Sequence, residues 1–571
     1  SLLQNRLTVF IESKDLLSAK QGGFREGYRT SDHIFIMKTL INKYLNKCKK
    51  NLYICFVDFK KAFDSVVRKA LLHKLLKKGI GGKLYDLLKH MYSNTLYCCK
   101  TDGFISESFH ANLGVKQGDS LSPTLFNIFV DDIDSYSNPV LSDPVNLNQN
   151  NFSHLLYADD LILISETPNG LQHCVDALQS FCIDWGLNVN TKKTQTMILS
   201  NSKNRSLLDK HYFYFGPQPL ESATEYKYLD IVFNNRGKLN IAAENLADKA
   251  RKAYFALKSK LPYSNCIAVE KWVRLFNSLI SPIMTYGSEI WISDFNINLD
   301  TADKLPFEKV QNMIMKNVLG VHGKASNLAL RTELELYPVC FISYKLMFKY
   351  YARLTDIEVG NNPKFDLLKS AFIEDKKLYT QKSSCWVQSL HKLKKLINFD
   401  SLQISHNVFE DSLKNFYKCK ILGQLEHIKS NNTGKLRFYS KMCSSFDLKA
   451  YLRFDIKKYD RSLLTKIRIS AHSLAIETGR YSKPKILASE RYCKLCKDKV
   501  EDEVHFLLYC PLYKDLREKF DIFNNLNNDD DIKSTIYLLN PVNLVDTRQI
   551  CNYLSQAFEL RNKNLMSVGL P

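Results

Sequence analysis

The order of apolar and polar residues divides the chain into a mixed α/β part and a helical part. Residues 51–59 (NLYICFVDF) are apolar almost throughout, as in a strand buried on both faces. Residues 154–164 (HLLYADDLILI) predict two apolar strands joined by a short polar turn. Residues 171–186 (LQHCVDALQSFCIDWG) have helical spacing and stop at a glycine. Further strands are predicted at 194–200 and 226–233, so the chain begins as a mixture of strands and helices.

Helical spacing appears early and dominates after Gly237. Residues 66–78 (VVRKALLHKLLKK) predict a helix with Asp64 or Ser65 as its N-cap. Residues 241–261 predict a helix with a strongly apolar face. That face consists of Ala243, Leu246, Ala247, Ala250, Ala253 and Leu257. Amphipathic Lys- and Leu-rich stretches then predict helices to about residue 480.

Two adjacent carboxylates, Asp159 and Asp160, interrupt the apolar run HLLYADDLILIS. The stretch alone leaves two interpretations open, a plain hairpin turn and a metal-binding pair. A third carboxylate, Asp58, ends the strand predicted at 51–59. Three carboxylates at strand ends can hold two divalent ions, an arrangement that suits phosphoryl transfer, and Mg²⁺ is the natural ion for oxygen ligands.

The charge balance indicates a polyanionic partner. The 571 residues include 80 Lys and Arg against 59 Asp and Glu, a formal charge of +21 that is spread along the chain. The excess could form a basic surface that only contacts solvent, or a surface that binds a nucleic acid. We favour the second interpretation because the excess is large. No apolar run is long enough for a membrane span, and no signal peptide is visible. The chain starts at Ser1 in what resembles mid-domain sequence, so we expect a fragment of a longer protein.

Residues 493–510 (CKLCKDKVEDEVHFLLYC) contain four residues that can bind zinc. Cys493, Cys496, His505 and Cys510 follow the spacing C-x2-C-x8-H-x4-C. This spacing is typical of a structural zinc site, with free core thiols as the alternative. The fifteen cysteines in a chain without a secretion signal favour free thiols over a disulfide framework. An Asn/Asp-rich stretch, FNNLNNDDD, and a last short helix follow.

Six segments, taken in order, resemble the reverse transcriptases of non-LTR (LINE-like) retrotransposons. They are QGGFREGYRTSDHIF (21–35), FVDFKKAFDSV (56–66), GVKQGDSLSPTLFNIFV (114–130), YADD (157–160), GLNVNTKKT (186–194) and LFNSLISPIMTYGSEIW (275–291). YADD alone is a weak signal, whereas six motifs in order are a strong one. The 493–510 segment also resembles the C-terminal CCHC knuckle of these elements.

The resemblance implies a metal site and an activity. Asp58, Asp159 and Asp160 correspond to the metal carboxylates, with the Phe59 carbonyl as a further oxygen ligand for two Mg²⁺ ions. The implied reaction is RNA-directed DNA synthesis, the addition of deoxynucleoside triphosphates to a DNA primer at the nicked target DNA. The implied partners are the RNA template and the target DNA, with no membrane. The implied location is the nucleus, after assembly on element RNA in the cytoplasm.

The resemblance also assigns contacts to the nucleotide and template. Phe63 corresponds to an aromatic gate against the ribose 2′-hydroxyl, with a core aromatic as the alternative. Gln117 and Gly118 would line the nucleotide and template, and Arg25 would meet the triphosphate. Lys193 would protonate or neutralise the leaving pyrophosphate; a solvated loop lysine is the alternative, and the adjacent Lys192 could take the same role.

One residue departs from the family pattern, and it leaves a rival function open. The family usually has a glycine after Tyr-Leu in the primer-grip hairpin, where this chain has Asp230. A tight turn there would strain an aspartate. The alternative function is a catalytically inactive nucleic-acid-binding relic of such an element. A group II intron maturase or telomerase is disfavoured by the thumb and knuckle motifs.

The predicted fold class is α+β, a right-hand polymerase followed by a helical connector and a small zinc module. The predicted domains are fingers and palm (1–236), a helical thumb (237–330), a connector (331–485), a CCHC zinc knuckle with one structural Zn²⁺ (486–520) and a C-terminal tail (521–571). No second acidic cluster suggests a nicking endonuclease, which in the family usually lies elsewhere in the full protein.

Overall fold

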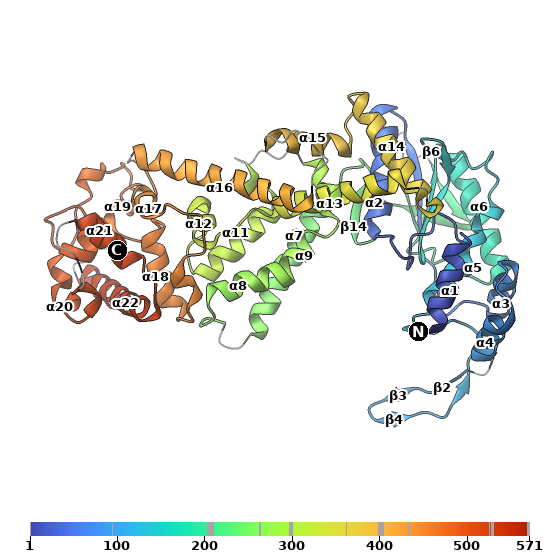
Figure 1. The fold of residues 1–571 in the computed structure, drawn as a ribbon, viewed down its shortest axis with the longest axis horizontal. Helices are drawn as coiled ribbons and strands as arrows, with labels where there is room; N and C mark the ends of the chain where they lie inside the picture. Colours follow the sequence, from blue (N-terminus) through green and yellow to red (C-terminus); the bar gives the residue numbers. More distant parts are fainter. Residues whose placement is uncertain are drawn as a thin grey trace. The chain divides into compact units, whose positions relative to one another are not determined.

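The computed structural model divides the chain into two compact units (Figure 1). Unit 1 comprises Ser1–Ala242, Gly287–Asn296 and Leu346–Leu402, and unit 2 comprises Ala243–Tyr286, Ile297–Lys345 and Gln403–Pro571. The described residues are 2–93, 95–202, 211–261, 264–295, 301–360, 362–397, 405–431, 434–524, 526 and 530–567. Parts of the predicted Asn/Asp-rich stretch, residues 525 and 527–529, lie outside them.

A six-stranded sheet forms the centre of unit 1, in the order β11-β12-β10-β1-β9-β8. Its strands are β1 Leu52–Val57, β8 His154–Tyr157, β9 Asp160–Ser165, β10 Gln195–Leu199, β11 Phe213–Phe215 and β12 Gln218–Ser222. β1 pairs with both β9 and β10 in antiparallel fashion, and β12 joins β10 in parallel. Every residue of β1 is buried, which explains the continuous apolar run at 51–59. The predicted strands at 51–59, 154–164 and 194–200 are thus confirmed.

Helices pack on the sheet and follow the predicted periodicity. α6, Pro168–Trp185, begins at the Thr167 cap, whose hydroxyl accepts a hydrogen bond from Gly170 N. It ends at Gly186, whose φ of +71° is the left-handed conformation that glycine adopts easily. α3 covers Arg68–Lys77, but neither Asp64 nor Ser65 caps it. The Ser65 hydroxyl donates instead to the carbonyl oxygens of residues 60 and 61, so the predicted cap is wrong.

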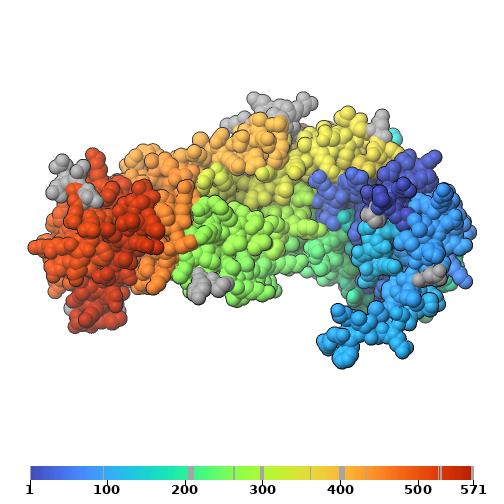
Figure 2. All heavy atoms as spheres, turned by 60° about the horizontal axis from the view of Figure 1, so that its bottom comes forward, coloured from blue at the N-terminus to red at the C-terminus, as the bar shows by residue number. Residues whose placement is uncertain are grey.

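Unit 1 also contains α1 Leu2–Ser13, α2 Thr30–Ile41, α4 Gly82–Ser93, α5 Ser122–Val130, α10 Ser288–Trp291, α14 Asp366–Thr380 and α15 Trp386–Leu396. The short strands β2 Leu96–Tyr97, β3 Lys100–Thr101, β4 Phe104–Ile105 and β5 Phe109–His110 form a ribbon that projects from the unit (Figures 1 and 2). Another hairpin is made by β6 Val145–Leu147 and β7 Asn150–Phe152.

Residues 346–402 pack within unit 1 although they lie in the predicted connector. Arg353, on α13 Val339–Val359, makes a two-point ion pair with the fully buried Asp32 of α2, with distances of 2.6 and 2.9 Å. Tyr350 donates a hydrogen bond of 2.9 Å to the same carboxylate. The compact units therefore divide the chain differently from the predicted domains. The segment 346–402 belongs to unit 1, where Tyr350 and Arg353 bind the buried carboxylate of Asp32.

Residues 226–233, predicted as one strand, form a hairpin. β13 Glu225–Tyr228 and β14 Ile231–Asn234 are antiparallel, with Tyr228 opposite Ile231. The ring of Tyr226 stacks on Phe56 of β1 at 4.1 Å between centroids and an interplanar angle of 8°. The hairpin therefore lies against the central strand of the sheet.

Unit 2 is helical, as the sequence predicts. Its helices are α7 Asn240–Lys260 (from residue 243), α8 Val269–Leu275, α9 Ser281–Met284, α11 Pro306–Leu319, α12 Asn327–Leu334, α16 His406–Asn431, α17 Arg437–Met442, α18 Lys458–Arg468, α19 Ala475–Thr478, α20 Lys514–Arg517, α21 Asp531–Leu539 and α22 Leu544–Ser567. Most of the predicted apolar face of α7, including Ala243, Leu246 and Ala250, is buried. Among the described residues, no helix combines the length and apolarity that a membrane crossing requires.

The last helix belongs to the core of unit 2 and is not a loose tail. On α22, Ile550, Tyr553 and Leu554 are fully buried. The helix packs against the strongly amphipathic α18, and also against α20, which lies within the predicted knuckle. The predicted limit between knuckle and tail therefore separates segments that pack together.

Candidate active site and metal centre

The strand register brings the three predicted carboxylates to one end of the sheet. Val57 of β1 lies opposite Leu161 of β9, so the next residue, Asp58, lies beside Asp160. β8 and β9 pair Tyr157 with Asp160, which leaves Ala158 and Asp159 as a two-residue turn. Ala158 has a φ of +58°, in the left-handed region, as such short hairpin turns require. The hairpin turn and the carboxylate pair are thus one structure, so the two interpretations of this stretch do not exclude each other.

The three carboxylates repel one another. The pKa of Asp160 is raised to about 6, first by burial and then by the negative charges of Asp159 and Asp58. The pKa of Asp159 is also raised, by burial and by Asp58. Asp159 and Asp160 nevertheless keep contact with solvent, so an ion can reach them. A cluster of carboxylates whose ionised forms are disfavoured fits a bound divalent cation, which would offset that repulsion.

Gln21 binds the turn of the carboxylate-bearing hairpin and was not assigned a role from the sequence. It is fully buried, and its Oε1 accepts from Ala158 N at 3.0 Å and from Gly23 N at 2.9 Å. A Cβ on Gly23 would lie 2.2 Å from Ala158 N, so only glycine fits there. The QGG motif was the available signal, since Gln followed by two glycines permits this close backbone approach.

The segment GLNVNTKKT pairs with the end of β1. Asn190 N donates to the Asp58 carbonyl oxygen at 2.7 Å, and Asp58 N donates to Thr194 Oγ1 at 3.1 Å. Phe59 forms a bridge with Val189, and its side chain is buried. Lys193 is exposed on this loop. The structure thus brings the lysine-bearing loop beside the carboxylates, as the motif order predicts.

Phe63 lies between the core and the open side of the site. Its half-buried ring stacks on Phe126 of α5 at 4.8 Å between centroids. Its carbonyl oxygen accepts from Val115 N at 2.9 Å, which connects it to the segment containing Gln117 and Gly118. Those two residues are exposed, and Gly118 has a φ of +85° that favours glycine. The three predicted nucleotide contacts therefore belong to one connected region.

Arg25 lies inside unit 1 and does not present a free guanidinium. Its Nε and Nη2 atoms pair with the two oxygens of Glu12 at 2.9 and 3.0 Å, and Nη1 donates to the Ser18 carbonyl at 2.8 Å. Burial is the largest single influence and lowers the pKa of Arg25, but the hydrogen bond to Glu12 and the attraction of nearby groups together outweigh it, so the pKa is raised. The structure therefore does not support the predicted triphosphate contact, because Arg25 fastens its own segment to α1.

Asp230 occupies a turn that favours glycine. Leu229 and Asp230 are the two turn residues of the β13–β14 hairpin, with φ values of +46° and +62°. A left-handed conformation costs a non-glycine residue roughly 1–2 kcal/mol. The Asp230 carboxylate pairs with Lys227 at 3.1 Å and also contributes to the raised pKa of Asp160. The departure from the family pattern thus adds strain and a fourth carboxylate near the cluster.

The four predicted zinc ligands meet in unit 2. The ligand atoms of Cys493, Cys496, His505 and Cys510 all lie within 4.8 Å of one another, and His505 Nε2 is 3.3 Å from Cys496 Sγ. The turn that carries the first pair is closed by Cys493 N donating to the Lys499 carbonyl at 2.8 Å. Hydrogen bonds to its sulfur, first from Cys510, lower the pKa of Cys493. Three sulfurs and one imidazole are a donor set that fits a tetrahedral metal ion.

Buried acids connect this Cys/His cluster to its surroundings, a feature not predicted from the sequence. Glu501 makes a two-point ion pair with Arg561 of α22 at 2.7 and 2.8 Å. Glu503 pairs with Arg437 at 3.0 Å and with His472 at 3.3 Å. Both acids are almost completely buried. The signal was the acidic run VEDE between the second and third ligands, but nothing in it indicates the distant partners.

Comparisons with known proteins find similarity to reverse transcriptases in the part of the chain that contains the three carboxylates. Residues 1–233 match the family model described as reverse transcriptase (RNA-dependent DNA polymerase). The chain is 24% identical over 298 residues to an RNA-directed DNA polymerase from mobile element jockey of Drosophila funebris, covering 51% of this chain and 31% of the relative. It is 30% identical over 260 residues to a Pol polyprotein from retrotransposable element R2 of Nasonia vitripennis, covering 43% and 24%.

These relatives are much longer than this chain, which spans between about a quarter and a third of their length. Among solved structures, the telomerase of Candida tropicalis in complex with a TWJ fragment of telomeric RNA aligns with a TM-score of 0.34 and 13% identity. That alignment covers 73% of this chain and 56% of the telomerase.

Proposed function

We propose that this chain is an RNA-directed DNA polymerase acting in target-primed reverse transcription, because residues 1–233 match the reverse transcriptase family model and the similar proteins include those of the jockey and R2 elements. Its template is RNA, its primer is the 3′ end of target DNA, and its substrates are deoxynucleoside triphosphates. This work would take place in the nucleus, after assembly on element RNA in the cytoplasm. The observation that carries the proposal is the register that places Asp58 beside Asp160, next to the turn with Asp159.

Each part of the site has a distinct task in this proposal. Asp58, Asp159, Asp160 and the Phe59 carbonyl oxygen would hold two Mg²⁺ ions. When bound, the ions supply activation of the primer hydroxyl and neutralisation of the leaving oxygens. Gln21 holds the turn of the hairpin in place through Ala158 N, so that the carboxylates keep their positions.

The remaining contacts select and orient the nucleotide. The open side of Phe63 would lie under the sugar and exclude a 2′-hydroxyl. Gln117 and Gly118, on the exposed loop joined to Phe63, would contact the nucleotide and template. Lys193 carries a positive charge on the loop that pairs with Asp58, where it would meet the leaving pyrophosphate.

The Cys/His cluster would bind one structural Zn²⁺. All four of its positions are supplied by protein atoms, so it would serve to hold structure and grip template RNA or target DNA, without a catalytic role. Lysines 494, 497 and 499 lie between its ligands and supply positive charge for that contact.

Primer extension by the purified chain tests the proposal. Asp159→Asn should abolish extension of a DNA primer on an RNA template, by at least about 10³-fold, since a metal ligand loses its charge. Template affinity should stay within about 2-fold, because one charge among many changes. Asp176→Asn, at an exposed position of α6, is the matched control and should extend normally. Extension by Asp159→Asn at the control rate would refute the site, and an inactive wild type would favour the relic.

A further inference from the structure

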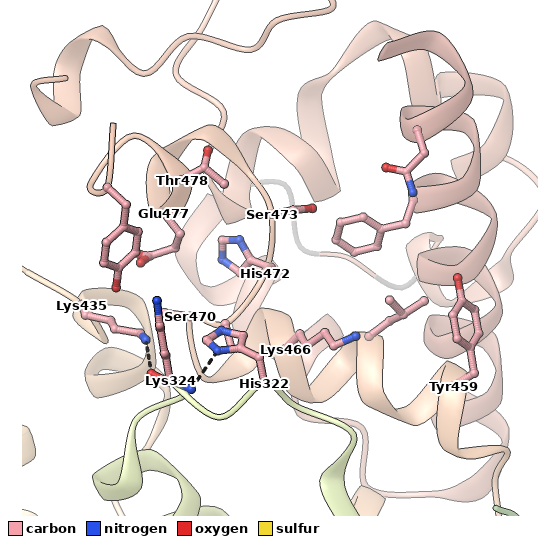
Figure 3. Close-up of a pocket in the computed structure, with 15 residues that line it drawn as sticks. His322, Lys324, Lys435, Tyr459, Lys466, Ser470, His472, Ser473, Glu477 and Thr478 are labelled. Atoms are coloured by element: carbon pink, nitrogen blue, oxygen red, sulfur yellow. Dashed lines mark hydrogen bonds between the residues drawn. The ribbon is translucent and has the colours of Figure 1, made fainter. Parts of the chain in front are cut away.

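A cavity of about 750 Å³ opens in unit 2, and none of the four predicted zinc ligands lines it (Figure 3). Its apolar floor includes Leu463 of α18, Ala471 and Phe558 of α22, all largely buried. Its size lies within the range of small-molecule and nucleotide sites. None of the carboxylates of the proposed polymerase site lines it.

The rim of this cavity is basic. Lys324, Lys435 and Lys466 line it together with His322, and Figure 3 shows Lys435, Lys324 and His322 along one edge. The Lys435 Nζ atom donates to the Lys324 carbonyl at 3.2 Å, so these two residues approach closely. Within the described ranges, neither Lys324 nor Lys466 has an ion-pair partner. The pKa of His322 is lowered, first by burial and then by the surrounding lysines. The rim therefore carries positive charge that an anion could neutralise.

Exposed aromatic rings stand beside these cations. Tyr459 and Tyr481 line the cavity and are 62% and 70% exposed. An adjoining cavity of about 560 Å³ shares Tyr459 and Lys466 and adds Lys457 and Lys458. Aromatic faces between cations are the arrangement that holds single-stranded nucleic acid, because bases stack on the rings while phosphates meet the charges.

Two polar atoms in the cavity lack partners. In the described part of the chain, Ser470 Oγ and Glu477 Oε1 are buried without a hydrogen-bond partner. The other oxygen of Glu477 accepts from Arg480 Nε at 2.9 Å. Buried polar groups normally have a hydrogen-bond partner, so a bound ligand is the natural partner for these two atoms. A carboxylate oxygen can only accept, and the ligand should therefore bring an N–H or O–H donor.

We propose that this cavity binds one nucleotide of a single-stranded nucleic acid. The base lies over the apolar floor against Tyr459 or Tyr481, and flanking phosphates meet the lysines of the rim. An exocyclic amino group donates to Glu477 Oε1, so cytosine, adenine and guanine are preferred to uracil and thymine. The strand continues past Tyr459 toward Lys457 and Lys458. This inference rests on the proposed function only in taking nucleic acid as the partner.

Anisotropy of labelled single-stranded 12-mers tests it with the full chain, without Mg²⁺ or nucleotides. Oligo(C) and oligo(U) are compared, each as RNA and as DNA, which distinguishes the two kinds of strand. Tyr459→Ala should raise the Kd for oligo(C) by about 5- to 100-fold, the range of one lost stacking contact. Tyr537→Ala is the matched control, since this tyrosine of α21 is 45% exposed and does not line the cavity. Glu477→Gln should reduce the preference for oligo(C) over oligo(U).

A second variant, Lys466→Gln, distinguishes lost binding from misfolding. It replaces the charged side chain of a half-exposed lysine with a neutral side chain of similar shape. It should also weaken binding while leaving the melting curve unchanged. Kd values equal to the control for both Tyr459→Ala and Lys466→Gln would overturn the inference. If the wild type extends primers while these variants bind normally, only this inference fails. If it extends none but the variants lose affinity, only the proposed polymerase function fails.

Discussion

Asp160 makes stability depend on pH in the metal-free protein. Its folded-state pKa of about 6 lies above the ordinary value of 3.8, so folding favours the protonated form. The resulting stabilisation is complete below pH 3.8 and is lost as pH rises through about 6. We therefore expect Asp160→Asn, which carries no charge, to melt at a higher temperature than the wild type at pH 7.5 in EDTA. Near pH 4 the two should melt alike.

Asp176→Asn serves as the control for this measurement, because it removes an exposed carboxylate of the same unit outside the cluster. Mg²⁺ should raise the melting temperature of the wild type above pH 6 and have little effect on Asp160→Asn. A wild type that matches Asp160→Asn at both pH values would show that the carboxylates do not repel one another.

Phe63 offers a test of sugar selection. Phe63→Val removes ring bulk without adding a polar group, so a gate at this position predicts a higher ratio of ribonucleotide to deoxynucleotide incorporation. A purely structural ring predicts a loss of stability of up to about 3 kcal/mol and an unchanged ratio. Both efficiencies are measured on one template beside a melting curve. Phe215→Val is the control, because Phe215 packs on the same core from β11.

The residues of the site could be predicted where their positions follow from the local sequence pattern. Asp58 follows a buried strand, and Asp159 and Asp160 lie at the turn between two others, so pattern and motif together located the cluster. Arg25 shows the opposite case. Its sequence position suggested a phosphate ligand, but a carboxylate on α1, Glu12, takes its guanidinium. Which partner an arginine meets depends on how its segment packs on the rest of the fold, here a turn-rich segment on α1, and no local pattern indicates it.

At the scale of elements, short-range order was predictable and long-range pairing was not. The strands β1, β8, β9 and β10 follow from apolar runs, and α6 follows from its periodicity and terminal glycine. The hairpin at 225–234 was harder, because Leu229 and Asp230 are not typical residues for a left-handed turn. The packing of 346–402 in unit 1 could not be predicted from the sequence, because it depends on contacts such as that between Arg353 and Asp32, which are 321 residues apart.

The knuckle and α22 form one packed region, which changes what zinc removal should do. Phe506, next to the ligand His505, contacts Phe558 of α22 at 5.0 Å between ring centroids. Cys493→Ser with Cys496→Ser should abolish the one zinc expected per chain and speed hydrogen exchange in both 491–510 and α22. Extension on a short primed template should survive, because no carboxylate of the polymerase site lies in this region.

Cys419→Ser is the control for the zinc experiment, since Cys419 is exposed on α16. It should keep the metal and the exchange pattern of the wild type. Chain purified without a chelator and found to contain no zinc would contradict the metal assignment. Faster exchange in 491–510 alone would show that α22 is stable without the knuckle.

For the whole molecule, the excess of positive charge should govern affinity for nucleic acid. A formal charge of +21 on 571 residues gives a long-range attraction for any polyanion. Base-specific contacts are few by comparison, so most of the binding free energy should come from phosphates and released counterions. Affinity measured at one salt concentration would therefore say little about specificity.

A salt titration separates these contributions. With six to ten phosphate contacts, RNA affinity should fall by about 10³- to 10⁵-fold between 50 and 200 mM salt. Asp159→Asn should show the same slope as the wild type, because it removes no cation. Lys466→Gln should lower the slope of log affinity against log salt by about 0.7, the value for one lost contact to a single strand. An affinity that does not change with salt would contradict the electrostatic explanation of binding. A steep titration in which Lys466→Gln keeps the wild-type slope would show that other lysines contact the phosphates and that the cavity in unit 2 does not contribute to the electrostatic binding.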